Sequence, residues 1–139
     1  MRILVTGSRD FTDWRAITIA LTETADGDRN VTLVQGCAKG TDFLAAQAAR
    51  KMGWQVEDHP ADWNAPCRDT CGKRDHRRPG RGGVTYCPAA GDYRNQEMVD
   101  TGADVCLAFY KQGARNKGTT DCANRAKAAG ITVVRIVEE

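Results

Sequence analysis

Residues 31–42, Val-Thr-Leu-Val-Gln-Gly-Cys-Ala-Lys-Gly-Thr-Asp, decide the fold. The first five of them predict a buried strand, and the next five form a loop bounded by two glycines. This loop leads directly into a helix expected over residues 41–52, and residues 54–58 predict the next strand. A strand, a helix and a second strand make one β-α-β unit, whose two strands run parallel.

The same alternation extends in both directions along the chain. Before this unit, residues 2–6 predict a strand and residues 13–25 a helix, in which Ile17 and Leu21 recur at helical spacing. After it, helices are expected over 92–101 and 119–129, and strands over 104–109 and 131–137. This alternation predicts an α/β, Rossmann-like three-layer fold with a five-stranded, mostly parallel sheet and helices on both faces.

Length and composition agree with one domain over residues 1–139. The chain has 139 residues, 41% of them hydrophobic, so it can bury a core. The net charge of +2 is too small to indicate a nucleic-acid partner from the chain as a whole. No apolar run approaches the ~20 residues that cross a bilayer, and no signal-peptide pattern is visible at the N-terminus. We therefore expect no membrane association and a cytoplasmic location.

Ligands of parallel α/β sheets bind at the carboxyl ends of the strands, so the loops there carry the candidate binding residues. These loops are rich in glycine, hydroxyl and cationic groups, and two of them lead into helix N-termini, which attract anions. The spacing matches neither a P-loop nor a dinucleotide fingerprint. The alternative interpretation is a set of tight turns with solvated charges and with Thr41 or Asp42 as a helix cap. The predicted ligand- or phosphate-binding residues of these loops are Gly7, Ser8, Arg9, Gly36, Lys39, Gly40, Thr41, Asp42, Gly118, Thr119 and Thr120.

Five motifs follow one another in order: Gly7-Ser8-Arg9, Gly36-Cys37-Ala38-Lys39-Gly40-Thr41-Asp42, Pro60-Ala61-Asp62-Trp63, Arg94-Asn95-Gln96-Glu97-Met98 and Gly118-Thr119. Together they resemble the YspA-like branch of the SLOG superfamily, which occurs in phage and bacterial genomes and is related to the lonely-guy enzymes and to the DNA-processing protein DprA. The resemblance extends over nearly the whole chain except residues 64–89. It implies a Rossmann-like fold that binds or senses a nucleotide-derived, phosphorylated small molecule.

The resemblance also assigns roles to single residues. Lonely-guy enzymes cleave the N-glycosidic bond of nucleotides with an arginine and a glutamate. Arg94 occupies the arginine position and is the candidate catalytic residue, with Asn95 beside it as a ligand contact. Cys122 stands where the glutamate belongs, and Asp121 lies one residue early, ~100° away around a helix. A nucleotide N-glycosidase (phosphoribohydrolase-like) is therefore the alternative to a binding or sensing protein, and whether the chain is an enzyme stays open.

Residues 64–89 interrupt the alternation and contain few aliphatic side chains. The spacing Cys-x3-Cys-x4-His-x10-Cys gives a Cys3His set suited to structural zinc, which would supply the folding energy that an apolar core does not. The alternative is a mobile loop with incidental cysteines. The predicted zinc ligands are Cys67, Cys71, His76 and Cys87, with His59 as the substitute for His76.

The insertion is also basic, with six Lys or Arg residues against two Asp residues between positions 67 and 87. Two roles stay open for it. These charges could bind nucleic acid, or the insertion could form a lid over the phosphate loops. We favour the lid because both ends of the insertion lie at the predicted ligand edge. Since related proteins often pair through helices, a homo-oligomer is also a candidate assembly.

Overall fold

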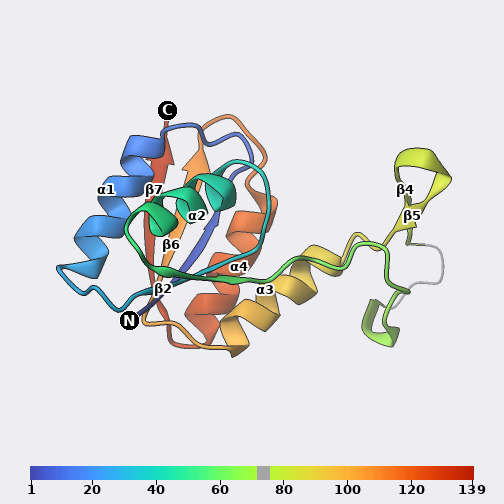
Figure 1. The fold of residues 1–139 in the computed structure, drawn as a ribbon. Helices are drawn as coiled ribbons and strands as arrows, with labels where there is room; N and C mark the ends of the chain where they lie inside the picture. Colours follow the sequence, from blue (N-terminus) through green and yellow to red (C-terminus); the bar gives the residue numbers. More distant parts are fainter. Residues whose placement is uncertain (72–75) are drawn as a thin grey trace.

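The computed structural model describes residues 1–71 and 76–139 (Figure 1). The predicted alternation is confirmed, with element boundaries displaced by one or two residues. Within the two described ranges, no helix is long and apolar enough to span a membrane. The strands of the main sheet are β1 (Arg2–Gly7), β2 (Thr32–Gln35), β3 (Gln55–Asp58), β6 (Val105–Lys111) and β7 (Thr132–Glu138). The helices are α1 (Trp14–Ala25), α2 (Thr41–Lys51), α3 (Ala90–Asp100) and α4 (Lys117–Ala128).

The topology of the main sheet explains where a ligand site can form. The strand order is β3-β2-β1-β6-β7, and every neighbouring pair of strands is parallel. The Rossmann-like prediction is thus confirmed, with a sheet that is wholly rather than mostly parallel. From β1 the chain builds outward through β2 and β3 on one side, then crosses to β6 and β7 on the other. A crevice forms at such a switch point, outside the carboxyl ends of the central strands.

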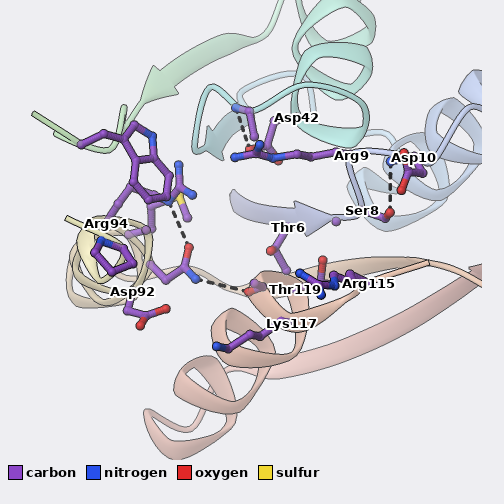
Figure 2. A pocket seen from close by; sticks show the side chains of 18 residues that line it. Thr6, Ser8, Arg9, Asp10, Asp42, Asp92, Arg94, Arg115, Lys117 and Thr119 are labelled. Carbon is purple, nitrogen blue, oxygen red and sulfur yellow. Dashed lines mark hydrogen bonds between the residues drawn. The ribbon is translucent and has the colours of Figure 1, made fainter. Parts of the chain in front are cut away.

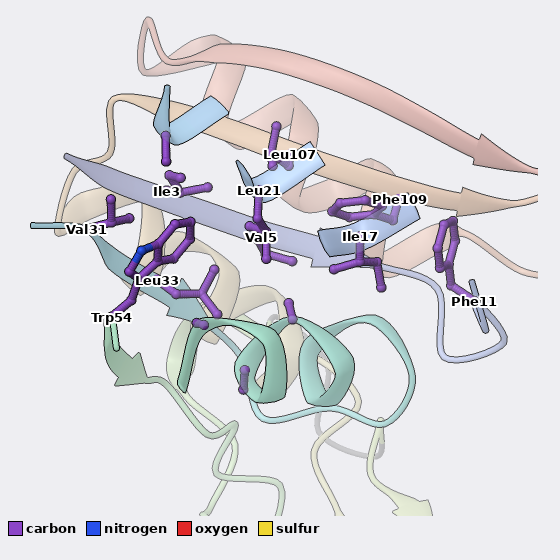
Figure 3. Packing of buried hydrophobic residues seen from close by; sticks show 14 residues of the cluster. Ile3, Val5, Phe11, Ile17, Leu21, Val31, Leu33, Trp54, Leu107 and Phe109 are labelled. Atoms are coloured by element: carbon purple, nitrogen blue, oxygen red, sulfur yellow. The ribbon is translucent and has the colours of Figure 1, made fainter. Parts of the chain in front are cut away.

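Two helix layers cover the sheet and enclose its apolar core. On one face, α1 packs through Ile17 and Leu21, which are both fully buried (Figure 3). In the same cluster the ring of Phe11 lies edge-on to Phe109, with ring centroids 5.3 Å apart. On the other face, α3 and α4 pack a second buried cluster against β1, β2 and β6. The chain is therefore the expected three-layer fold, with the start of each helix at the carboxyl edge of the sheet.

We call residues 64–89 the arm. Its described part contains two 3₁₀ turns, η1 (Asp69–Cys71) and η2 (Arg81–Gly83), and the antiparallel pair β4 (Arg78–Pro79) and β5 (Thr85–Tyr86). Figure 1 shows this pair projecting away from the sheet beyond the start of α3. The expected lid is therefore wrong for the hairpin. The physical reason is that no described residue of 64–86 belongs to the buried hydrophobic clusters, so the apolar core does not hold the hairpin against the body.

Candidate functional site

A cavity of about 430 Å³ opens at the carboxyl edge of the sheet, where the switch point lies. It is surrounded by the β1–α1 loop, the start of α2, the residues at the base of the arm, α3 and the start of α4 (Figure 2). Small-molecule cavities commonly measure about 300–1,000 Å³, so this one is large enough for a small organic ligand. Its lining residues are Thr6, Gly7, Ser8, Arg9, Asp10, Ala38, Asp42, Trp63, Pro88, Gly91, Asp92, Arg94, Asn95, Met98, Arg115, Lys117, Gly118 and Thr119.

The structure brings together most, but not all, of the residues predicted to bind the ligand. Among the five that do not line the cavity, Lys39 and Thr120 are exposed to solvent, and Gly40 is the N-cap of α2. The other two, Gly36 and Thr41, are buried beside it. The predicted residues that line the cavity are Gly7, Ser8, Arg9, Asp42, Arg94, Asn95, Gly118 and Thr119.

Gly36 and Thr41 pack together the loops that build the cavity. Thr41 is fully buried, and its hydroxyl group donates to the carbonyl oxygen of Ser8 at 2.9 Å. A Cβ atom at Gly7 would overlap with the Thr41 side chain, so these loops approach closely only with glycine there. A Cβ atom at Gly36 would overlap with the guanidinium of Arg94, which donates to the Gly36 carbonyl oxygen. At these two positions, the glycine signal in the sequence reflects close contact between protein groups.

The start of α4 forms a wall of the cavity that attracts anions. Its N-cap residue, Asn116, makes no side-chain cap hydrogen bond, because the Asn116 side chain bonds to the backbone of the preceding loop. The first N–H groups of an α-helix have no partner within the helix, and Gly118 and Thr119 in this turn line the cavity. Arg115 and Lys117 stand beside them and add positive charge (Figure 2). Such a helix start is suited to a phosphate group.

Asp42 is the most deeply buried charged residue of the lining, with 6% of its surface exposed. Its Oδ2 atom accepts hydrogen bonds from the N–H groups of Gly36 and Ala38, both at 3.2 Å. Its Oδ1 atom is buried without a hydrogen-bond partner among the described residues. Burial raises the pKa of Asp42 to about 6, against the lowering effect of these N–H groups and of Arg94 and Arg9. At neutral pH the cavity therefore contains an ionised carboxylate with one free acceptor atom.

Arg94 and Asn95 lie on α3 and connect the walls of the cavity. The Arg94 guanidinium is held by the Gly36 carbonyl and donates from Nε to Asn95 Oδ1 at 3.0 Å. The Asn95 side chain is 4% exposed and donates to the Gly118 carbonyl at 3.3 Å and to Asp121 Oδ2 at 3.0 Å. Arg94 thus presents a fixed positive charge at the cavity, whereas Asn95 mainly holds α3 against α4.

Sequence reasoning missed several lining residues because only the folded chain brings them to the cavity. Asp10 and Asp92 add carboxylates, and Trp63 and Pro88 form the wall at the base of the arm. The ring of Trp63 lies edge-on to that of Tyr86, with centroids 5.9 Å apart. A signal for Trp63 was present, because it ends one of the five motifs. The residue type alone does not distinguish a core tryptophan from one that faces a ligand.

The position at which lonely-guy enzymes carry a glutamate does not face the cavity in this chain. Cys122 is fully buried in the cluster between α4 and the sheet, and it does not line the cavity. The Oδ2 atom of Asp121 accepts hydrogen bonds from the Asn95 side chain and from Arg125, whose Nε atom donates at 2.8 Å. The carboxylates that line the cavity are Asp10, Asp42 and Asp92. None of them comes from the helix that carries the glutamate motif.

A second site lies in the arm, where the four predicted metal ligands come together. The ligand atoms of Cys67, Cys71, His76 and Cys87 all lie within 4.8 Å of one another. His76 Nε2 is 2.9 Å from Cys67 Sγ and 3.4 Å from Cys87 Sγ. The Sγ atoms of Cys71 and Cys87 are 3.7 Å apart, much further than the ~2 Å of a disulfide. These atoms are close enough together to coordinate one metal ion.

His59 belongs to a separate hydrogen-bond network. The four side chains that come together in the arm, which we call the metal-ligand group, therefore include His76 and not His59. The two ring nitrogens of His59 bond to Glu57 Oε2 at 2.8 Å and to Glu97 Oε2 at 2.7 Å. Glu57 is also paired with Arg2, whose guanidinium donates to both carboxylate oxygens. Burial acts to lower the pKa of His59, but the hydrogen bonds to the two carboxylates outweigh it and raise that pKa.

The metal-ligand group and the cavity share the base of the arm. The Tyr93 hydroxyl lies 2.9 Å from Cys71 Sγ, and Tyr93 directly precedes Arg94 on α3. The N–H group of Cys87 donates to the Trp63 carbonyl oxygen at 2.9 Å. The residues that close the arm are therefore neighbours of those that line the cavity.

Comparisons with solved structures confirm the fold. The DNA processing protein A (DprA) of Streptococcus pneumoniae matches 99% of this chain with a TM-score of 0.62 at 20% sequence identity. The chain spans 50% of the length of DprA. TM1055 matches 95% of this chain and 71% of its own length, with a TM-score of 0.60 at 19% identity.

Comparisons of sequence give the family. A model of the YspA, cpYpsA-related SLOG family matches residues 1–65, which include the β1–α1 loop and the start of α2. The Gene 61 protein of Mycobacterium phage D29 is 37% identical over 142 residues, covering 96% of this chain and 94% of that protein. On these two matches, the chain belongs to the YspA, cpYpsA-related SLOG family.

Proposed function

We propose that the cavity binds a nucleoside phosphate or a related phosphorylated small molecule, and that the protein acts by binding or sensing this ligand. The observation that carries the proposal is the juxtaposition of an uncapped helix start with cationic side chains in one cavity of about 430 Å³. Membership of a SLOG family supports a nucleotide-related role. Four cations and three carboxylates line the cavity, so its charge balance favours an anion.

The phosphate group would lie between the start of α4 and the β1–α1 loop. Arg9, Arg115 and Lys117 supply charge there, and the N–H groups of the first turn of α4 supply directed donors. Ser8 is 3% exposed, and its Oγ atom accepts from the N–H group of Asp10, which leaves the hydroxyl proton free to donate. The base would lie against Trp63, whose flat ring supports stacking of any base.

We expect binding without hydrolysis of the N-glycosidic bond. The helix position that carries the glutamate in lonely-guy enzymes is the buried Cys122, and Asp121 is already engaged by Arg125. Arg94 would then stabilise ligand charge and catalyse no bond cleavage. Release of free base during prolonged incubation with a nucleotide would contradict this part of the proposal and favour the N-glycosidase alternative.

Isothermal titration calorimetry with AMP, GMP, CMP and UMP tests the proposed function. At least one of these monophosphates should bind, and the matched nucleoside, which lacks the phosphate, should bind at least tenfold more weakly. The test variant is Lys117→Gln at the start of α4, with Lys127→Gln in the last turn of the same helix as matched control. Lys117→Gln should weaken binding about three- to tenfold, and the control should not. Equal affinity for nucleotide and nucleoside would overturn the phosphate site.

We further propose that the arm binds one Zn²⁺ through Cys67, Cys71, His76 and Cys87. Tetrahedral zinc with Zn–S bonds of about 2.3 Å places neighbouring sulfurs about 3.8 Å apart, and the Cys71–Cys87 sulfur distance of 3.7 Å fits that value. Zinc would act structurally, because the set supplies four protein ligands and leaves no open position for catalysis. A reducing compartment such as the cytoplasm would keep the thiols available to the metal.

A second candidate function, contact with nucleic acid, is favoured by the shape and charge of the arm. Arg78 and Arg81 are exposed on its projecting part, and neither takes part in an ion pair within residues 1–71 and 76–139 (Figure 1). Binding of duplex DNA or RNA should then weaken steeply with salt and drop further in Arg78→Gln/Arg81→Gln. Binding unchanged by the double variant would remove this candidate.

A further inference from the structure

We propose that the free Oδ1 atom of Asp42 accepts a hydrogen bond from a neutral donor of the bound nucleotide, either a ribose hydroxyl group or an exocyclic amine of the base. The inference rests on the proposed function and specifies which part of the ligand Asp42 contacts. It separates Asp42 from the phosphate-binding residues, with which the sequence alone groups it. Asp42 is thus a specificity-determining residue.

The Asp42 carboxylate is fixed in place. Asp42 lies in the first turn of α2, and the N–H groups of Gly36 and Ala38 hold its Oδ2 atom. Because that side chain is 6% exposed and lines the cavity, it cannot rotate into solvent without losing both bonds. The Oδ1 atom is therefore fixed in a residue that lines the cavity, with its lone pairs unused.

A buried acceptor without a hydrogen bond is costly, so the Oδ1 atom needs a partner. Leaving such an atom unpaired costs about 1–3 kcal/mol, more for a charged group. No described side chain or backbone group supplies a donor to Oδ1. All other buried side-chain oxygen and nitrogen atoms of the described residues have a partner. The only orphan of this kind among the described residues therefore belongs to a residue that lines the cavity at the carboxyl edge of the sheet.

Electrostatic repulsion excludes the phosphate group of the ligand as that partner. The charged and titratable groups facing Asp42 are Arg9 from the β1–α1 loop, Arg94 from α3 and Cys122 from α4. The two arginines favour the carboxylate form, whereas burial opposes it. A carboxylate repels a phosphate but accepts well from hydroxyl and amine groups. Among the chemical groups of a nucleotide, only the sugar and the base carry such donors.

The test replaces the acceptor with a donor while keeping the shape of the side chain. In Asp42→Asn, the carbonyl oxygen can still accept from Gly36 and Ala38, while the amide presents N–H groups at the Oδ1 position. Removing a negative charge should by itself tighten binding of an anion. We expect the opposite, a loss of AMP affinity of about ten- to hundredfold, because a charged hydrogen bond is lost and two donors face each other.

Glu23→Gln provides the matched charge control. Glu23 is exposed on α1 and does not line the cavity, so its replacement removes a negative charge without changing the site. This variant should bind AMP as tightly as the natural chain. Thermal unfolding at pH 7 checks that Asp42→Asn is folded, and we expect it to be no less stable than the natural chain.

Two AMP analogues identify the donor. 2′,3′-Dideoxy-AMP lacks the ribose hydroxyl groups, and IMP lacks the exocyclic amine. For the analogue that lacks the true donor, Asp42→Asn should weaken binding by less than about threefold. If AMP binds to the natural chain but Asp42→Asn binds it equally well, the inference is wrong. Equal losses for AMP and both analogues would also overturn it. If no nucleotide binds to the natural chain, the proposed function itself fails.

Discussion

The body of this chain and its arm are held together by different chemistry. The body buries apolar side chains on both faces of a parallel sheet, among them Ile3, Leu33 and Phe109 with no exposed surface. The described part of the arm contributes Cys87 as its one buried residue. Its order rests on a few polar contacts and on the convergence of three thiols and an imidazole. Burial can thus stabilise the body alone, whereas the arm has no apolar core and would gain its stability from the proposed metal.

Removal of the metal should have the largest effect, and it should be confined to the arm. After treatment with a strong chelator, we expect amide hydrogen exchange of residues 64–89 to approach that of an unfolded peptide, because no apolar core replaces the metal bonds. Elemental analysis before chelation should give one zinc per chain. Cys67→Ser/Cys71→Ser should lose that zinc, and the matched variant Cys37→Ser, at an exposed cysteine outside the arm, should retain it. Retained zinc in the double variant would remove our account of the arm.

A large-to-small substitution in the core should destabilise the body and leave the arm unaffected. Leu33 is fully buried in β2, so Leu33→Ala should lower the free energy of unfolding by about 2–5 kcal/mol in urea titrations. The zinc content should not change. Val137→Ala, at an exposed position of β7, should change the same free energy by less than about 0.5 kcal/mol. Loss of zinc in Leu33→Ala would show that the two regions are not independent.

Gly7→Ala tests whether this glycine serves contact between protein groups. The new methyl group would overlap with the Thr41 side chain, so we expect the free energy of unfolding to fall by about 1–3 kcal/mol. In Gly7→Ala/Thr41→Ser the smaller hydroxyl side chain should recover part of that loss. A fully stable Gly7→Ala that binds no nucleotide would contradict the packing role and assign Gly7 to the ligand.

The pH dependence of stability should show the buried carboxylate of Asp42. Its pKa is about 6 in the folded chain against an ordinary 3.8, so the folded state binds more protons between these values. Stability due to this group is therefore present at low pH and is lost as pH rises through 6. Between pH 5 and pH 7 the difference should be about 1 kcal/mol in the natural chain and absent in Asp42→Asn, after other titrations cancel between the two. Identical pH profiles would contradict the burial of an ionisable Asp42.

The sequence predicts the body well because the spacing of hydrophobic residues and the position of turn-forming glycines are local properties of the chain. Ile17 and Leu21 mark the buried side of α1, and the glycine-bounded loop after β2 marks the start of α2. The metal-ligand group was predictable for a similar reason, since the spacing of Cys67, Cys71, His76 and Cys87 is a property of the chain. Sequence alone did not distinguish His76 from His59, because the carboxylates that bond to His59 come from β3 and α3.

The cavity was predictable in its location but only partly in its residues. The carboxyl edge follows from the parallel topology, whereas the lining depends on how side chains pack. Thr41 and Asp42 are adjacent in sequence, yet one fills a gap between loops and the other faces the cavity. Asp92 and Trp63 reach the cavity through the placement of α3 and the arm. Such contacts join residues tens of positions apart, and no local pattern encodes them.

The central claim is that the cavity binds a nucleotide. Native mass spectrometry of the purified protein, incubated with the four nucleoside monophosphates, tests it most directly. We predict one nucleotide per chain in addition to one zinc, with the nucleotide strongly reduced in Arg9→Gln/Lys117→Gln while the zinc is retained. Absence of any nucleotide adduct, or an adduct of equal strength in the double variant, would contradict the assignment of this cavity as a nucleotide site.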